Sequence, residues 1–224
     1  MSFDLALVGG AVVGLAAGAL LLPVTQRELA AAIGRSAETP PPPELTVRRW
    51  HRIALVVLSG LLPAAVLARA GWSVVALPPL LLLLGLVPLA YCDLTRLLLP
   101  RTMVHATTAV VGLSVLLAAS MTGHWHRAAG AALCGLGLFL VLFAINLANP
   151  AWMAFGDVRL APAVGLGLAW VSPIALVQGF FLANVLAALV GLALMIGQRA
   201  GRRTALPFGV FLAAASALII MAWS

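Results

Sequence analysis

Two aspartates stand apart from the other acidic residues of this 224-residue chain. Asp93 and Asp157 each lie at the edge of a long hydrophobic run in an otherwise apolar sequence. The other four acids lie at the N-terminus or in one polar stretch: Asp4, Glu28, Glu38 and Glu44. A carboxylate beside a lipid bilayer is costly, and a residue kept there usually serves a function. We therefore predict that Asp93 and Asp157 form one catalytic pair.

A pair of neighbouring carboxyl groups can hydrolyse an amide bond. The two groups can share one proton, because both cannot ionise cheaply at close range. The ionised member takes a proton from water, and the protonated member polarises the carbonyl group of the substrate. The sequence does not decide which aspartate has which role.

The composition predicts that membrane helices carry this pair. Hydrophobic residues make up 63% of the chain and charged residues 8%. A soluble domain of this length could not bury so much apolar surface, and several uncharged runs reach the roughly 18 residues that a helix needs to cross a bilayer. The net charge of +7 comes from arginines in loops, which orient a membrane protein and do not indicate nucleic-acid binding. We expect an all-α, polytopic transmembrane helical bundle in contact with lipid.

The hydrophobic runs predict about eight spans within a single membrane domain, residues 1–224. The spans are residues 4–24, 51–69, 72–90, 102–120, 128–148, 158–172, 174–197 and 205–223. No basic segment precedes the first run, so we expect a retained span there and no cleaved signal peptide. Residues 25–50 would form a short cytoplasmic loop, in which the proline run 40–43 predicts a stiff, extended connector.

The arginines predict which side of the membrane each loop occupies. With the N- and C-termini outside, eleven of the thirteen arginines fall in cytoplasmic loops, and only Arg69 and Arg127 fall outside. Such a bias is typical of membrane proteins. Asp93, after the third span, and Asp157, before the sixth, then lie at the same cytoplasmic edge. All six tryptophans fall near predicted span ends, where an indole can lie at the level of the headgroups.

Several other residues have simpler structural interpretations. Three glycines at four-residue spacing in the first span predict close packing against another helix: Gly10, Gly14 and Gly18. Cys92 and Cys134 are the only cysteines, which argues against a disulfide framework and a cysteine zinc site. We expect Cys92 to pack as a small apolar residue. His105 could approach Asp93, but packing or a surface hydrogen bond is the simpler interpretation. The sequence predicts no metal site and no cofactor.

Each candidate motif also has a simple interpretation when it is taken alone. Most Gly-Asp pairs mark helix starts, with the aspartate at or near the N-cap, which would explain Gly156-Asp157. Gly156 would otherwise let a substrate or a partner helix come near the carboxylate. Asp93 could be an interfacial aspartate paired with Arg96. Pro207 is favoured in the first turn of a helix, which would explain the segment before the last span.

Taken together and in this order, three segments resemble the signatures of prepilin peptidases, bacterial membrane aspartic proteases of the GxGD type. The segments are Asp93 to Pro100, Gly156 to Leu160, and Pro207 to Gly209. The resemblance covers residues 80–220, which would be the peptidase core. It implies that the two aspartates are catalytic. It also implies supporting roles for Gly156, Pro207, Phe208 and Gly209.

The chain departs from the family pattern in three positions and one loop. Ala154 stands in place of the first glycine, Arg159 replaces the usual lysine, and Val210 stands where a second proline is common. Close approach to the aspartate therefore depends on Gly156. The loop 25–50 has no cysteine, whereas many family members carry a cysteine-containing segment and an N-methyltransferase function there. We expect a peptidase without that second activity.

The resemblance also implies a substrate and a location. The substrate would be a type IV prepilin or pseudopilin precursor, with a short basic leader on the cytoplasmic side and a hydrophobic helix in the bilayer. Cleavage would follow a glycine between these two parts. The protein would lie in the bacterial cytoplasmic (inner) membrane and serve a pilus or protein secretion system.

Two other functions fit some of these features. Isolated membrane aspartates also occur in proton-coupled transporters and channels, but here both acids lie at one edge and none at the midplane. A presenilin-like protease shares the Gly-Asp pair. Such a protease usually has a Tyr-Asp motif, whereas Cys92 separates Tyr91 from Asp93. It also has a Pro-Ala-Leu motif, in place of which this chain has Pro207-Phe208-Gly209.

Overall fold

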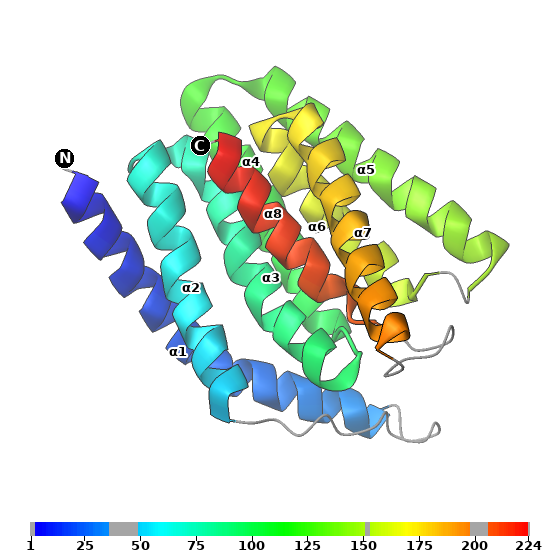
Figure 1. The fold of residues 1–224 in the computed structure, drawn as a ribbon. Helices are drawn as coiled ribbons and strands as arrows, with labels where there is room; N and C mark the ends of the chain where they lie inside the picture. Colours follow the sequence, from blue (N-terminus) through cyan, green and yellow to red (C-terminus); the bar gives the residue numbers. More distant parts are fainter. Residues whose placement is uncertain (1–2, 36–48, 151–152, 198–205, 224) are drawn as a thin grey trace.

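The computed structural model describes residues 3–35, 49–150, 153–197 and 206–223. Within these residues the chain is all-α, with eight α-helices and one short 3₁₀ helix (Figure 1). The helices are α1 Phe3–Arg35, α2 Arg49–Ala70, η1 Val74–Ala76, α3 Leu77–Arg96, α4 Arg101–Thr122, α5 Trp125–Ala148, α6 Phe155–Val171, α7 Pro173–Ile196 and α8 Phe208–Trp223. The predicted all-α class is confirmed. The proline run 40–43 lies outside the described residues.

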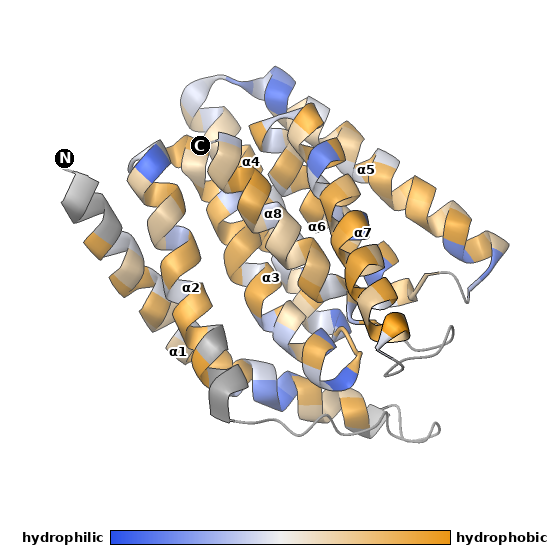
Figure 2. Cartoon of the chain, viewed as in Figure 1, coloured by the Kyte–Doolittle hydropathy of each residue, from blue (hydrophilic) through white to orange (hydrophobic). Residues whose placement is uncertain are grey.

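Five of the described helices are long and apolar enough to cross a membrane. These candidate spans are Val8–Ile33, Val74–Arg96, Arg101–Thr122, Trp125–Ala148 and Pro173–Ile196. Large apolar side chains are exposed on several of them, including Leu20, Leu133 and Ile196, and the ribbons of α5 and α7 are mostly hydrophobic in Figure 2. So much exposed apolar surface suggests a multi-pass membrane protein. The apolar stretches of α2 and α8 are shorter, and the number of eight spans stays a prediction.

The two helices that carry the aspartates lie inside the bundle (Figure 1). α3 packs against α1, α2, α4, α6 and α8, and α6 packs against α3, α4, α5, α7 and α8. α3 is the most buried of the five candidate spans, and most side chains of α6 are buried. The remaining helices therefore form a shell around α3 and α6.

Small residues let neighbouring helices approach closely. A Cβ added to Gly165 of α6 would overlap backbone atoms of Gly135 in α5, so the two backbones touch at this crossing. The glycines at four-residue spacing in α1 face α2 in the same way: Gly10, Gly14 and Gly18. The prediction of close packing at these three glycines is confirmed, and their partner is a helix of the same chain.

The stretch 25–50 differs from its prediction as a loop. Residues 25–35 continue α1 as a helix. Pro23 lies inside α1, where proline commonly bends a helix, and in Figure 1 the ribbon of α1 turns so that its last part crosses the end of the bundle. We call residues 24–35 the α1 arm. Its alanines and other good helix formers favour this extension, and Leu29 anchors it in a cluster with Val87 and Tyr91 of α3.

The helix ends near the aspartates also differ from the predicted spans. α3 continues to Arg96, so Asp93 lies in its last turn, and α6 begins at Phe155, so Asp157 lies in its first turn. Leu97 ends α3 in a left-handed conformation with φ 51° and ψ 38°. It is the one non-glycine residue with positive φ in the described part of the chain, a conformation that costs roughly 1–2 kcal/mol for a residue with a Cβ.

The described arginines divide between the two ends of the bundle in agreement with the charge pattern. Arg69 donates a hydrogen bond to the carbonyl of Met221 at the end of α8, and Arg127 donates to carbonyl groups at the end of α6. The start of α1 lies at this same end, away from the aspartates (Figure 1). Trp170 lies in the last turn of α6, near a span end as predicted. Its side chain is buried between helices, where the indole N–H donates a hydrogen bond to the carbonyl of Val75.

We predict that Gly165→Ala destabilises the bundle, because the new Cβ would overlap the backbone of α5. Overpacking of this kind costs roughly 1–3 kcal/mol, so the thermal unfolding midpoint of the protein in detergent should fall. Gly137→Ala is the matched control on α5, because no atom lies within 4 Å of its added Cβ. Equal midpoints for the two variants would contradict the described packing of α5 on α6.

Candidate active site

Asp93 lies in the last turn of the central helix α3, directly before the left-handed turn at Leu97. Its side chain is only 7% exposed. A carboxyl group withdrawn from water in this way needs hydrogen-bond donors. The end of the bundle can supply them, because helix termini carry backbone amides that have no partner within their own helix.

The start of α8 supplies these donors. The amide of Gly209 donates a hydrogen bond of 2.6 Å to Asp93 Oδ2, and the amide of Val210 also interacts with this carboxyl group. The first amides of a helix carry a partial positive charge, so a carboxylate is a favourable partner for them. A Cβ at position 209 would lie 2.9 Å from Asp93 Oδ2, which explains why glycine occupies this position.

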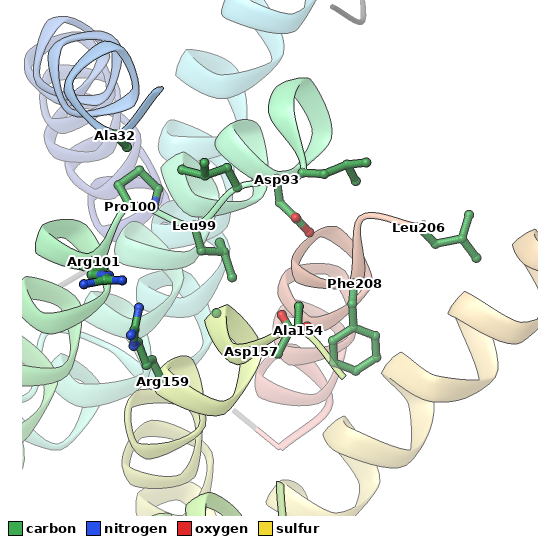
Figure 3. A pocket seen from close by; sticks show the side chains of 13 residues that line it. Ala32, Asp93, Leu99, Pro100, Arg101, Ala154, Asp157, Arg159, Leu206 and Phe208 are labelled. Atoms are coloured by element: carbon green, nitrogen blue, oxygen red, sulfur yellow. The ribbon is translucent and has the colours of Figure 1, made fainter. Parts of the chain in front are cut away.

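Asp157 lies in the first turn of α6 and is also 7% exposed. Ala154 is the N-cap residue, and its carbonyl accepts a hydrogen bond of 3.0 Å from the amide of Asp157. No hydrogen bond to the carboxyl group of Asp157 occurs within the described part of the chain. A capping role therefore does not account for this side chain, which lines a cavity instead (Figure 3).

Gly156 lets the turn after α3 approach the start of α6. A Cβ added to Gly156 would lie 3.1 Å from Leu99 Cδ1 and 3.2 Å from Leu99 Cβ. We expected Gly156 to admit a partner helix or a substrate. Its close neighbour is Leu99, in the turn that follows Asp93, so this contact holds the two aspartate-bearing segments together.

The two aspartates line one cavity of about 520 Å³ at the end of the bundle. The walls come from the α1 arm, the end of α3 with its turn, the starts of α4, α6 and α8, and the segments just before α6 and α8: Ala32, Asp93, Leu97, Leu98, Leu99, Pro100, Arg101, Ala154, Gly156, Asp157, Arg159, Leu206 and Phe208. Both carboxyl groups lie on the same side of this cavity in Figure 3, and they interact electrostatically. Helices distant in the sequence thus bring the predicted pair together.

The opposite side of the cavity is positively charged. Arg101 is the first residue of α4, and Arg159 lies in α6 shortly after Asp157. The guanidinium group of Arg159 lies over the ring of Phe155, 4.3 Å from its centroid. Leu99 lies between the two arginines and the two aspartates in Figure 3. The cavity therefore has an acidic side and a basic side.

Most residues singled out in the sequence meet at this place. Four of them line the cavity: Asp93, Gly156, Asp157 and Phe208. Gly209 lies against Asp93, and Pro207 precedes α8 and accepts a hydrogen bond from its first turn. Cys92 is buried in an apolar cluster, as predicted. His105 does not join these residues, because it is exposed on α4 and does not line the cavity.

Sequence reasoning missed three parts of the site: the α1 arm, Leu99 and Arg101. The alanine-rich stretch after Glu28 was a signal for the arm, because alanine favours helix. The short turn ending in Pro100 was a signal that its residues stay close to Asp93. Arg101 gave no signal beyond its charge. Among the described residues no group of three or more His, Cys, Asp and Glu side chains comes together as metal ligands.

We predict that Leu99→Cys combined with Gly156→Cys produces a disulfide. The two Cβ atoms would lie 3.2 Å apart, which is close to the roughly 3.5–4.5 Å found in disulfides. Cys92 and Cys134 are free and would be replaced by alanine beforehand. The mass of the oxidised, alkylated protein reports the bond, and each single-cysteine variant is a control. Two thiols that both react with the alkylating agent after oxidation would contradict the contact.

Comparison with known proteins identified no relative. No family model, no curated protein and no solved structure matches the chain. A function is therefore inferred from the residues and motifs of this chain, above all from the two aspartates and the groups around their cavity.

Proposed function

We propose that the protein is a membrane aspartic endopeptidase in which Asp93 and Asp157 are the catalytic pair. One observation carries this proposal: two buried carboxyl groups from different helices line the same cavity and interact with each other. Carboxyl groups in such proximity can share one proton. Hydrolysis of an amide bond by activated water uses that arrangement.

In the proposed reaction, water binds between the two carboxyl groups. The ionised carboxylate removes a proton from the water as its oxygen attacks the scissile carbonyl, and the protonated carboxyl group gives its proton to the carbonyl oxygen. When the resulting diol collapses, a proton passes to the leaving amine and the pair again holds one proton. The amide of Gly209 donates a hydrogen bond to Asp93 Oδ2, and Oδ1 is the oxygen of Asp93 that would exchange protons with water or substrate.

The position of the pair at helix ends supports this chemistry. Water reaches the end of a bundle more easily than the middle of a hydrocarbon layer. A substrate segment must also be extended at the cleavage point, because the carbonyl groups of a helix are already hydrogen-bonded. A cavity of about 520 Å³ beside the aspartates leaves room for such a segment.

We further propose a type IV prepilin or pseudopilin precursor as the substrate, on the basis of the three motifs that resemble prepilin peptidases. In this proposal all eight helices cross the bacterial inner membrane, both termini are outside, and the cavity opens at the cytoplasmic edge. The charge pattern supports this orientation, because Arg69 and Arg127 lie at the end of the bundle opposite the aspartates. The basic leader would then be removed after its glycine on the cytoplasmic side.

We predict that Asp93→Asn and Asp157→Asn each reduce cleavage at least about a thousandfold, because an amide can neither activate water nor share the proton. The assay incubates each purified variant in detergent with a precursor that has a basic leader, a glycine and a hydrophobic helix. Mass spectrometry of the product identifies its new N-terminus. Unchanged thermal unfolding midpoints would show that the variants still fold.

Substantial cleavage by either variant would contradict the proposal. The rival function gives a different pattern. If the wild-type protein leaves the precursor intact, and proton flux into liposomes disappears when either aspartate is neutralised, the protein is a proton-coupled transporter or channel and not a peptidase.

We predict that Gly209→Ala lowers kcat about tenfold, because the added Cβ would lie 2.9 Å from Asp93 Oδ2 and would push the amide away. A hydrogen bond to a charged group contributes roughly 1.5–3 kcal/mol, and about 1.4 kcal/mol corresponds to a tenfold change in rate. Gly130→Ala is the control, since no atom lies within 4 Å of its added Cβ. Wild-type kcat in Gly209→Ala would show that the amide of Gly209 does not position Asp93.

A further inference from the structure

Two arginines share the basic side of the cavity. Arg101 and Arg159 both line it, and their side chains lie beside each other in Figure 3. The charge of Arg101 acts unfavourably on Arg159. Arg101 is exposed and Arg159 is half-buried, so water weakens their repulsion in part, and a bound anion would offset the remainder.

No acidic side chain of the described residues forms an ion pair with either arginine. Arg159 lies over the ring of Phe155. On the α1 arm, Glu28 reaches the first turn of α4, but its carboxylate accepts a hydrogen bond from the hydroxyl of Thr102. The two aspartates of the cavity lie on the far side of Leu99 (Figure 3).

The start of α4 adds to the positive charge. The first turn of α4 contains no acidic residue, and its N-cap residue, Pro100, provides no side-chain acceptor. The amino end of a helix carries a partial positive charge, so a cation such as Arg101 is unfavourable there. Two guanidinium groups and a helix end therefore point to an anionic ligand on this side of the cavity.

We propose that Arg101 and Arg159 form a subsite for a carboxylate side chain of the polypeptide that is cleaved. This inference rests on the proposed function, because the occupant is its substrate. The subsite and the two aspartates line one cavity. A polypeptide bound for cleavage at the aspartates would therefore extend past the two arginines. Guanidinium groups bind carboxylates through two parallel hydrogen bonds, which makes this pair a specificity determinant beside the catalytic pair.

The test compares precursors in which one glutamate is moved through the positions on either side of the scissile bond, each paired with the matching glutamine precursor. For wild-type protein in phosphatidylcholine vesicles, we expect one position at which glutamate raises kcat/KM about tenfold over glutamine. In the double variant Arg101→Gln, Arg159→Gln, this ratio should fall to about one. The variant Arg159→Glu should instead prefer a precursor with lysine at that position over one with glutamine. A purely structural role of Arg159 would not reverse the charge preference in this way.

Arg27→Gln is the matched control, because Arg27 is exposed on the α1 arm and does not line the cavity. It should keep the wild-type preference for glutamate. Thermal unfolding midpoints confirm that each variant is folded before its ratio is interpreted.

Three outcomes would overturn the subsite. A wild-type protein that cleaves all precursors with equal kcat/KM has no carboxylate preference. A preference that survives in the double variant arises elsewhere. The arginine substitutions could also slow cleavage of all precursors equally, and only in vesicles that contain phosphatidylglycerol. In that case the two arginines bind a lipid headgroup and not the substrate. If the wild-type protein cleaves no precursor, the result is distinct from these three. It rejects the proposed peptidase function, and with it a substrate carboxylate as the ligand of the arginines.

Discussion

The hydrogen bond from the amide of Gly209 to Asp93 Oδ2 is the interaction around which the end of the bundle is built. It meets two needs at once. A buried carboxyl group requires a donor, and the first amides of α8 require an acceptor. The contact joins the end of α3 to the start of α8. It therefore fixes Asp93 relative to a helix that lies more than a hundred residues later in the sequence. The absence of a side chain at Gly209 is a condition of this contact, since a Cβ would collide with the carboxyl oxygen.

The second aspartate is held through backbone packing and not through its own hydrogen bonds. Gly156 permits contact with Leu99, and the strained left-handed conformation of Leu97 directs the chain into that contact immediately after α3. The crossing of Gly165 on Gly135 fixes α6 against α5 at a deeper level of the bundle. Rigid inner helices are suited to hold reactive groups in a constant relation. The carboxyl group of Asp157 is thereby left open to the cavity while its backbone is tightly constrained.

The sequence was informative about the centre of the site and less informative about its walls. Asp93 and Asp157 could be selected because charged residues at the edges of apolar runs are conspicuous, whereas Gly209 was selected through the resemblance of Pro207-Phe208-Gly209 to a family motif. The helix ends were misplaced, because hydropathy reports where apolar residues stop and not where the backbone leaves the helix. The α1 arm was missed for the same reason, since its helix is polar on one side and covers the end of the bundle. The short turn ending in Pro100 indicated that Leu99 stays near Asp93, but the contacts of Arg101 depend on tertiary packing, which no local pattern encodes.

The charges of the cavity stay separated because of helix geometry. Asp157 and Arg159 line the same cavity from one helix, yet residues two apart on a helix do not face each other. Arg101 approaches from α4, on the side of Arg159, and in the view of Figure 3 Leu99 lies between both arginines and the carboxyl groups. An arginine in contact with either aspartate would favour its ionised form and prevent the pair from sharing a proton. In the proposed peptidase, the same turn that brings Leu99 to Gly156 therefore keeps the cations available for substrate and away from the catalytic pair.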